Sequence, residues 1–346
     1  MTILTNTPVF TALSYNARLW GGTGMVHGEA TRLYFEDHQR VDQIADRLHE
    51  MGPDVIGLQE VFCPEMQHRL MERLREDYPY HVRSSTYDGV EQSIRTVRRL
   101  WPRFGDFYAR NIQKVVDGFT LSHYSRDGLP TRLLRKFVSE DAVLRFLYKA
   151  TAQQFLWGAG LLFFSKYPIL DHEFVPHPIR ADLEQFAEKG VLKVTLQPPQ
   201  TDRVTVLLTH LQEGDTSHAV SARRRQLGQI QDLMRDSAER VVVMGDLNVP
   251  EGWPGQYEEM AAGLLEVGGF DCFRTVYPDR QETPGYTYRV GNRFERKLLG
   301  ESHPFVGEDQ RLDYLFARGL RVLGSGVLET EFSGLSDHSP ILVRFG

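Results

Sequence analysis

Acidic and amide side chains stand at the ends of two strand-length apolar runs in this sequence. Glu60 follows the apolar residues 55–58, so its carboxylate would emerge where a buried strand ends. Such a position suits a hard cation and is costly for an unpaired charge. Asn16 ends an earlier run in the same way, and its amide carbonyl could ligate Mg²⁺ or orient a water of that ion. Taken singly, each residue has a plain alternative, an ion-paired glutamate or a turn-forming asparagine.

A second pattern is Gly245-Asp246-Leu247-Asn248, which follows four apolar residues. The glycine permits a close approach to the backbone, and Asp246 and Asn248 project from the same side of an extended chain. A carboxylate and an amide placed in this way can hold one reacting oxygen between them. An Asx turn after a strand is the structural alternative for the same residues.

Histidine and aspartate occur together near the end of the sequence. Asp337 and His338 precede the last apolar run, and Asp313 offers a second carboxylate on a nearby predicted strand. A buried histidine that donates to one aspartate while facing a phosphate can stabilise charge or transfer a proton. His210 is a further polar residue at a strand end, although a lone histidine there is more often an ordinary core or surface residue.

Strands and helices in alternation are needed to bring these side chains together. The predicted strands span residues 10–16, 55–60, 204–210, 241–246, 311–316 and 341–345. The predicted amphipathic helices span residues 40–51, a segment that starts at Pro64, and residues 218–235. Turns are predicted around Pro284-Gly285 and from Gly324 to Gly326. This order of elements favours a layered α/β fold.

Length and composition limit the class of protein. The 346 residues, with 41% hydrophobic and 25% charged residues, are typical of a globular chain and exclude a disordered, collagen-like or coiled-coil protein. Two cysteines, Cys63 and Cys272, exclude a disulfide-rich scaffold or a thiolate zinc cluster, and we expect two free thiols rather than one bridge. No bilayer-spanning run or signal peptide is apparent, so we expect a cytoplasmic protein in which peripheral membrane contact remains open.

Charge is unevenly distributed along the chain. The net charge is −6, which argues against a general polyanion binder. Residues 88–150 nevertheless contain 12 lysines and arginines against 7 acidic residues, a net charge of +5, which leaves −11 for the remainder. Basic and aromatic residues interrupt the strand and helix order over 88–157. We interpret this segment as a mostly helical insertion within a single catalytic domain that spans residues 1–346.

Taken together, the motifs make this sequence similar to the endonuclease/exonuclease/phosphatase superfamily. The matching residues, in family order, are Asn16, Leu58-Gln59-Glu60, Thr209-His210-Leu211, Gly245-Asp246-Leu247-Asn248, Arg311-Leu312-Asp313-Tyr314 and Ser336-Asp337-His338. The resemblance implies a four-layered α/β sandwich, in which helices flank two packed mixed β-sheets. It also implies Mg²⁺ as the cofactor, which Mn²⁺ could replace, and hydrolysis of a phosphoester by in-line attack of water.

The resemblance further implies a role for each matching residue. Glu60 would be the main metal ligand, with Asn16 and Asp337 in the metal shell. Asp246 would orient or deprotonate the attacking water. The remaining roles concern the phosphate: Asn248 and His210 would bind its oxygens. His338, paired with Asp313, would stabilise the developing charge or act in proton transfer.

Within that superfamily, the sequence looks most similar to the neutral sphingomyelinase branch. The supporting segments are Gln59-Glu60-Val61-Phe62, Tyr78-Pro79-Tyr80, Phe163 to Ile169, and Ala187-Glu188-Lys189-Gly190-Val191. The branch implies a phospholipid head-group diester as substrate. A nuclease or an inositol-phosphate phosphatase of the same fold remains an alternative, and the basic segment 88–157 favours the nuclease because phosphate contacts require lysine and arginine. A catalytically inactive binding scaffold is a third interpretation, which the intact motifs disfavour; no protein partner is predicted.

Overall fold

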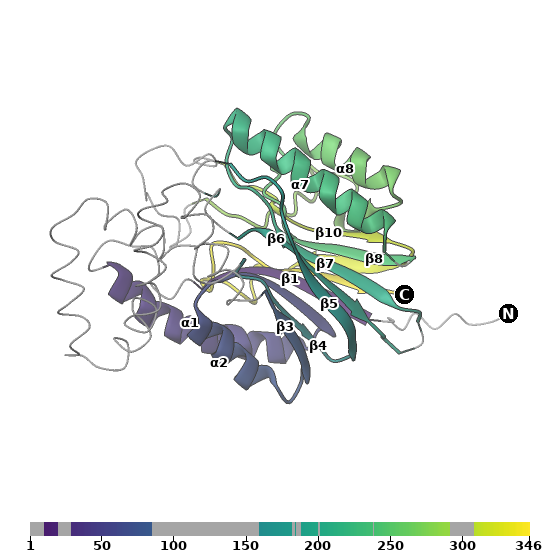
Figure 1. Ribbon diagram of the computed structural model, residues 1–346. Helices are drawn as coiled ribbons and strands as arrows, with labels where there is room; N and C mark the ends of the chain where they lie inside the picture. The colour runs from purple at the N-terminus through teal and green to yellow at the C-terminus, as the bar shows by residue number, and fades with distance from the viewer. Residues whose placement is uncertain are drawn as a thin grey trace, which may run out of the picture.

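Two β-sheets pack face to face at the centre of the molecule, and helices cover their outer faces (Figure 1). The computed structural model describes residues 10–19, 29–84, 159–181, 184, 188–199, 201–237, 239–290 and 308–346. Each sheet contains both parallel and antiparallel pairs within these residues. The predicted fold class, a four-layered α/β sandwich, is therefore confirmed.

The first sheet has the spatial order β11-β12-β1-β2-β4-β3. Its strands are β1 (Phe10–Leu19), β2 (Val55–Val61), β3 (Tyr80–Arg83), β4 (Leu162–Ser165), β11 (Val322–Val327) and β12 (Ile341–Phe345). β1 and β2 run parallel, and β12 pairs antiparallel with β1. The carboxyl ends of β1 and β2 and the amino end of β12 therefore meet at one edge.

The second sheet has the spatial order β5-β6-β7-β8-β10-β9. Its strands are β5 (Ile169–Pro176), β6 (Gly190–Leu196), β7 (Val204–His210), β8 (Arg240–Asp246), β9 (Phe270–Asp271) and β10 (Asp313–Arg318). β7 and β8 run parallel, whereas β10 is antiparallel to β8. The carboxyl ends of β7 and β8 consequently lie beside the first residue of β10.

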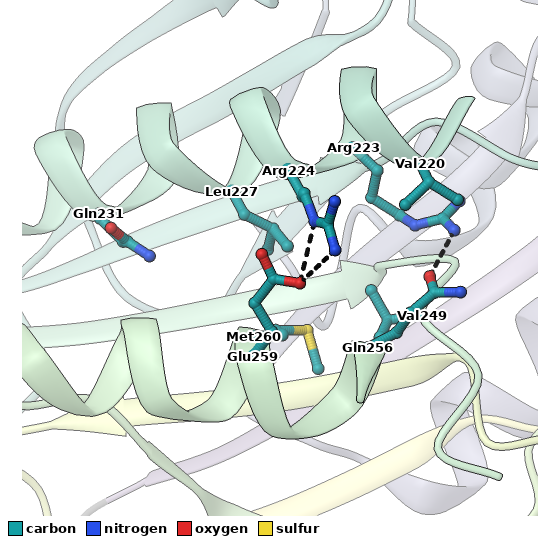
Figure 2. Close-up of a pocket in the computed structure, with 9 residues that line it drawn as sticks. All are labelled: Val220, Arg223, Arg224, Leu227, Gln231, Val249, Gln256, Glu259 and Met260. Carbon is teal, nitrogen blue, oxygen red and sulfur yellow. Dashed lines mark hydrogen bonds and ion pairs between the residues drawn. The ribbon is translucent and has the colours of Figure 1, made fainter. Parts of the chain in front are cut away.

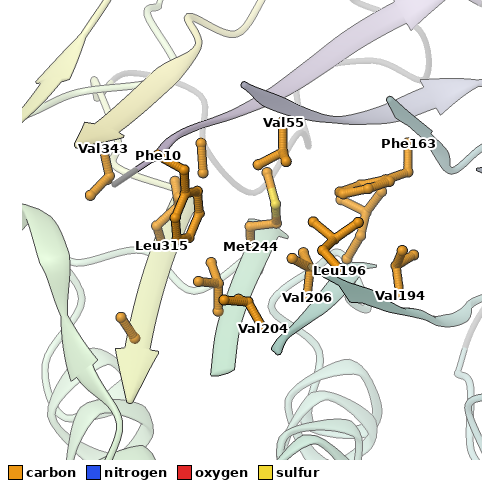
Figure 3. Close-up of a cluster of buried hydrophobic side chains, with 14 of the residues drawn as sticks. Phe10, Val55, Phe163, Val194, Leu196, Val204, Val206, Met244, Leu315 and Val343 are labelled. Carbon is orange, nitrogen blue, oxygen red and sulfur yellow. The ribbon is translucent and has the colours of Figure 1, made fainter. Parts of the chain in front are cut away.

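Apolar side chains from both sheets fill the space between them (Figure 3). Phe10 and Val55 of the first sheet face Val204 and Met244 of the second. The two sheets come especially close at Gly57, where a Cβ atom would lie 2.9 Å from the Met244 side chain. Glycine at this position therefore lets the two layers interlock.

Helices on the two outer faces complete the four layers. α1 (Glu29–Met51) and α2 (Pro64–Leu74) cover the first sheet, and α7 (Ser217–Arg235) and α8 (Gln256–Glu266) cover the second (Figure 1). A short helix, α9 (Cys272–Val276), follows β9. The predicted start of α2 at Pro64 is confirmed, and α7 begins one residue before its predicted start at residue 218 and ends at Arg235 as predicted. α1 begins earlier than the predicted residue 40, because buried charged residues, Asp37 and Arg40, extend its inner face beyond the apolar stripe.

Two local predictions differ from the structure. Residues Gly324 to Gly326 form part of β11 rather than a turn, with a bulge between Val322 and Gly324. β11 is an edge strand, where glycine and bulges are tolerated. The guanidinium of Arg344 on β12 occupies the space that a Cβ of Gly324 would need. In addition, β1 continues three residues beyond its predicted end at Asn16.

Several expectations concern other properties of the chain. Cys63 and Cys272 are both buried free thiols, as expected. No helix within the described residues is long and apolar enough to cross a bilayer. The proposed insertion at residues 88–157 lies outside the described residues.

Candidate active site

Asn16 joins the two sheets at the edge where their strand ends meet. Its Nδ2 donates to Oε1 of Glu60 at 3.0 Å and to Oδ2 of Asp246 at 3.1 Å. Glu60 lies in the same sheet as Asn16, whereas Asp246 ends β8 in the opposite sheet. Asn16 and Asp246 are almost completely buried. Three predicted site residues from separate strand ends thus form one contiguous group.

The backbone is strained at this edge. Arg18, Glu60 and Asn248 are non-glycine residues with φ of 49°, 57° and 51°. Each left-handed conformation of this kind costs on the order of 1–3 kcal/mol and persists only where surrounding contacts fix it. Arg18 and Glu60 lie one residue before the ends of β1 and β2, and Asn248 lies two residues beyond the end of β8. The strain therefore coincides with the polar group described above.

Asp313 and His338 form a buried hydrogen-bonded pair. His338 Nδ1 lies 2.7 Å from Oδ2 of Asp313, and its Nε2 lies 3.8 Å from Oδ2 of Asp246. Burial alone would lower the pKa of His338. The negative charges of Asp313 and Asp246 outweigh burial and hold that pKa well above its usual range. The raised pKa favours the protonated imidazole, which lies between two carboxylates.

Asp246 titrates near neutrality because of its surroundings. Burial, followed by the negative charge of Asp313, raises the pKa of Asp246 to about 7. The charge of His338 and hydrogen bonds from Asn16 and the Asn248 backbone act in the opposite direction. Asn248 N–H donates to Oδ1 of Asp246 at 2.9 Å, which makes the predicted Asx turn part of the site. A carboxylate with such a pKa can accept a proton at neutral pH.

His210 lies against the same group in its neutral form. Its Nε2 is 3.7 Å from Oδ2 of Asp246 and 3.9 Å from Oε1 of Glu60. Burial, with a further contribution from the charge of Lys189, holds the pKa of His210 well below its usual value. Its buried Nδ1 has no hydrogen-bond partner among the described residues. A neutral imidazole in this position can offer one N–H to an anionic ligand.

Asp337 is fixed by a residue that the sequence analysis did not single out. Arg18 Nε lies 2.9 Å from Oδ2 of Asp337. Ser336 Oγ lies 3.1 Å from Oδ1 of Asp337 and donates to the Asn16 carbonyl at 2.8 Å. Asp337 thus lies beside the end of β1 and is connected to Asn16 through one hydroxyl group.

Arg40 of α1 holds the backbone on both segments next to Asp337. It donates to the backbone carbonyls of Ala17, Arg18 and Leu335, and to the carboxylate of Asp37. The side chain is buried, so every donor that it directs at the backbone replaces a lost contact with water. α1 thereby connects the end of β1 with the loop that carries Asp337.

The donor set fits a hard divalent cation. Carboxylate oxygens of Asp246 and Asp313 and a ring nitrogen of His338 lie within 4.8 Å of one another, and Asp313 Oδ1 is a buried acceptor without a partner among the described residues. The carboxylate oxygens are the donors in this group that a cation can use while the imidazole is protonated. Glu60 adds another carboxylate oxygen beside Asp246. Oxygen donors of this kind suit Mg²⁺ or Mn²⁺. Asn16 directs its amide N–H groups at the Glu60 and Asp246 carboxylates, and its Oδ1 accepts from the Arg18 N–H at 3.3 Å.

All eight predicted site residues lie at this edge of the sandwich. Sequence reasoning missed the supporting residues Arg18 and Arg40. Arg18 lies two residues beyond Asn16, and this spacing could have indicated it. Arg40 carries no such signal, because it acts on backbone groups of segments far away in the sequence.

A pocket between α7 and α8 is separate from this site (Figure 2). Arg223 donates to Gln256 at 2.8 Å, and Arg224 pairs with Glu259 at 2.8 Å across the two helices. These contacts join the outer helical layer. None of the residues that line the pocket belongs to the predicted site.

Comparison with known families gives the family of this chain. Residues 33–338 match the Endonuclease/Exonuclease/phosphatase family. The chain belongs to this family. The match covers most of the sequence, and the predictions of this superfamily and of an enzyme that hydrolyses phosphoric esters are confirmed.

One curated relative of this family member is the inositol phosphosphingolipids phospholipase C of Schizosaccharomyces pombe. The two sequences are 27% identical over 180 residues, which cover 48% of this chain and 40% of the relative. The match thus spans less than half of the relative's length.

Solved structures share the fold of this family member at low sequence identity. Sphingomyelinase C from Streptomyces griseocarneus has a TM-score of 0.55 and 19% identity, with 98% of this chain and 100% of that chain covered. A variant of the Staphylococcus aureus beta toxin with bound magnesium ions has a TM-score of 0.56 and 16% identity, with 98% and 99% covered. At these identities the similarity concerns the fold.

Proposed function

We propose that this chain is a Mg²⁺-dependent phosphodiesterase that hydrolyses the head-group phosphodiester of a sphingomyelin-like phospholipid. The observation that carries the proposal is the contact of Asn16 with both Glu60 and Asp246, beside the Asp313–His338 pair. The relative named as an inositol phosphosphingolipids phospholipase C supports the substrate class. The family match from residue 33 to 338 supports one catalytic domain.

In this proposal, Glu60 and Asp337 hold the cation, and Asn16 keeps Glu60 in place. Mg²⁺, or Mn²⁺ in its place, neutralises the charge of the phosphodiester and lowers the pKa of a nearby water when it is bound. Glu60 is the residue whose loss should weaken cation binding most, because its charged oxygen lies beside the Asp246 carboxylate. The ion pair with Arg18 fixes the position of the Asp337 carboxylate.

The remaining residues bind the substrate and move protons. Asp246, with its pKa of about 7, accepts the proton of the water that attacks phosphorus. Asn248 and the neutral His210 donate to phosphate oxygens. As the bond between phosphorus and the leaving alcohol breaks, His338 stabilises the charge and supplies a proton to the alcohol oxygen, with Asp313 orienting its imidazole.

We further propose that the enzyme meets its substrate at a membrane surface as a peripheral protein of the cytoplasm. A nuclease or an inositol-phosphate phosphatase is the alternative, and the positive charge of residues 88–150 favours the nuclease. Affinity for DNA that falls steeply with rising salt would support the nuclease, because released counterions drive such binding.

A substrate panel tests the proposal directly. The protein is assayed in Mg²⁺, in Mn²⁺ and in excess chelator with sphingomyelin, inositol phosphosphingolipid, phosphatidylcholine, bis(p-nitrophenyl) phosphate, abasic DNA and inositol phosphates. We expect metal-dependent release of the head group from a sphingolipid. Preferential cleavage of DNA or of an inositol phosphate would overturn the lipid assignment, and chelator-resistant activity would overturn the metal requirement.

A further inference from the structure

Thr287 connects the two chain segments that carry the proposed acid–base pair. Its Oγ1 accepts hydrogen bonds from the backbone N–H groups of Leu312 at 3.0 Å and Asp313 at 3.1 Å. Its own carbonyl accepts from the Ser339 N–H at 2.7 Å. One residue therefore contacts the segment of Asp313 and the segment of His338 at the same time.

The neighbouring residue adds contacts to both segments. Tyr288 exchanges two backbone hydrogen bonds of 2.9 Å with Gln310, three residues before Asp313. Its ring meets the imidazole of His338 edge-on, with centroids 5.4 Å apart. The segment around Thr287 thus contacts the residues just before β10 on one side and the loop that carries His338 on the other.

The hydroxyl oxygen of Thr287 has a function that an apolar side chain of the same size cannot supply, because it accepts two backbone hydrogen bonds. Thr287 is fully buried, as is Asp313, and the N–H groups of Leu312 and Asp313 point at one oxygen. Without that oxygen, both N–H groups would be left unpaired in a region from which water is excluded. The backbone would relieve this loss by moving, and the Asp313 side chain would move with it.

We propose that Thr287 is a positioning residue that sets the geometry of the Asp313–His338 pair. The inference rests on the proposed function, in which that pair supplies charge stabilisation and a proton. Thr287 touches no substrate atom in this proposal. It acts by fixing the backbone at Asp313 and at Ser339, so that the bond between His338 Nδ1 and Asp313 Oδ2 stays at 2.7 Å.

Three substitutions separate the hydroxyl from the bulk of the side chain. Thr287→Ser keeps the oxygen and removes a methyl group, Thr287→Ala removes both, and Thr287→Val keeps the shape without the acceptor. Thr205→Val is the matched control, because Thr205 is also buried but lies at the opposite end of β7 from His210. Circular dichroism establishes which variants are folded.

Kinetics on the preferred phosphodiester provide the first measurement. We expect Thr287→Val and Thr287→Ala to lower kcat by about 10- to 100-fold, with KM and the Mg²⁺ requirement within about 3-fold of the parent, since misplaced catalytic groups reduce the rate of the chemical step. Thr287→Ser and Thr205→Val should retain kcat within about 3-fold. A Thr287→Val or Thr287→Ala variant that is as active as Thr205→Val would overturn the inference.

A second measurement does not depend on activity. The proton shared by His338 Nδ1 and Asp313 should give a downfield imidazole signal in the NMR spectrum, identified by its absence from His338→Gln. We expect Thr287→Ser and Thr205→Val to retain this signal and Thr287→Ala to lose or shift it. An unchanged signal in Thr287→Ala overturns the inference. If the parent protein cleaves no phosphodiester, the proposed function fails, and the signal alone decides the role of Thr287.

Discussion

Asp246 and Asp313 lie directly opposite each other in the antiparallel pairing of β8 with β10. Facing carboxylates repel each other, and this repulsion is one reason why the pKa of Asp246 rises to about 7. His338 lies between them, 2.7 Å from Asp313 and 3.8 Å from Asp246. The register of two strands thus sets the two carboxylates opposite each other, and His338 contacts both of them.

Glu60→Gln should abolish most activity by weakening metal binding. The substitution keeps the size of the side chain but removes the negative oxygen, which matters more to a hard cation than to a neutral pocket. We expect the Mg²⁺ concentration for half-maximal rate to rise by about 10-fold or more. Metal titrations of the rate measure this effect, with Glu72→Gln on the exposed face of α2 as the control. A normal rate with an unchanged Mg²⁺ requirement would refute the assignment of Glu60.

Asp246→Asn and His338→Ala should each lower kcat by at least about 100-fold, the usual scale for losing a positioned acid–base group. Asp246→Asn removes the acceptor for the proton of the attacking water, and His338→Ala removes the protonated imidazole. Steady-state kinetics with a chromogenic diester measure both effects, and circular dichroism establishes that the variants are folded. Either variant with most of its rate intact would contradict the role given to that residue.

The strands and helices of the fold were predictable where their buried residues form an apolar pattern in the sequence. The runs 204–210 and 341–345 became β7 and β12 without change, because buried strands need continuous apolar sequence. Pattern reasoning failed where polar residues are buried, as at Asp37 and Arg40 of α1. It also failed at Gly324, where a strand uses glycine to accommodate Arg344.

The candidate site was predictable residue by residue but not as a network. Polar residues at successive strand ends indicated Asn16, Glu60 and Asp246, because each alone has a structural explanation but their occurrence together is improbable by chance. The sequence does not predict that Asn16 donates hydrogen bonds to both Glu60 and Asp246, because that contact depends on how the two sheets pack. The role of Thr287 is hidden for the same reason, as its partners are 25 and 26 residues away.

Arg40→Met should destabilise the protein by about 3–5 kcal/mol, the cost of leaving a buried partner charge uncompensated. The buried guanidinium pairs with Asp37 and holds the carbonyls of Ala17, Arg18 and Leu335. Urea unfolding at pH 7 measures the change, and Arg47→Met, at an exposed position of the same helix, should change stability by less than about 1 kcal/mol. Equal stabilities for the two variants would show that the buried contacts of Arg40 contribute nothing.

His177 should make the protein lose stability as the pH falls from about 6.5 to 4. Burial, assisted by the charge of Lys189, lowers the pKa of His177 to about 4, although a hydrogen bond with Gln229 opposes the shift. Between pH 6.5 and 4, His177 is therefore protonated in the unfolded chain, where its pKa is about 6.5, but stays neutral in the folded protein. The stabilisation is complete above pH 6.5 and is lost as the pH falls through 4.

The size of this effect follows from the shift of about 2.5 pH units, which corresponds to at most about 3 kcal/mol. His177→Gln should therefore show a shallower decline of unfolding free energy between pH 6.5 and 4, whatever its stability at pH 7. His210, with its pKa also lowered, stays in both proteins and keeps its own part of the slope. His172→Gln, at an exposed position of β5, controls for the loss of an imidazole and should keep the parent slope. If the parent and His177→Gln decline in parallel, His177 is charged in the folded protein, and its burial has no part in acid unfolding.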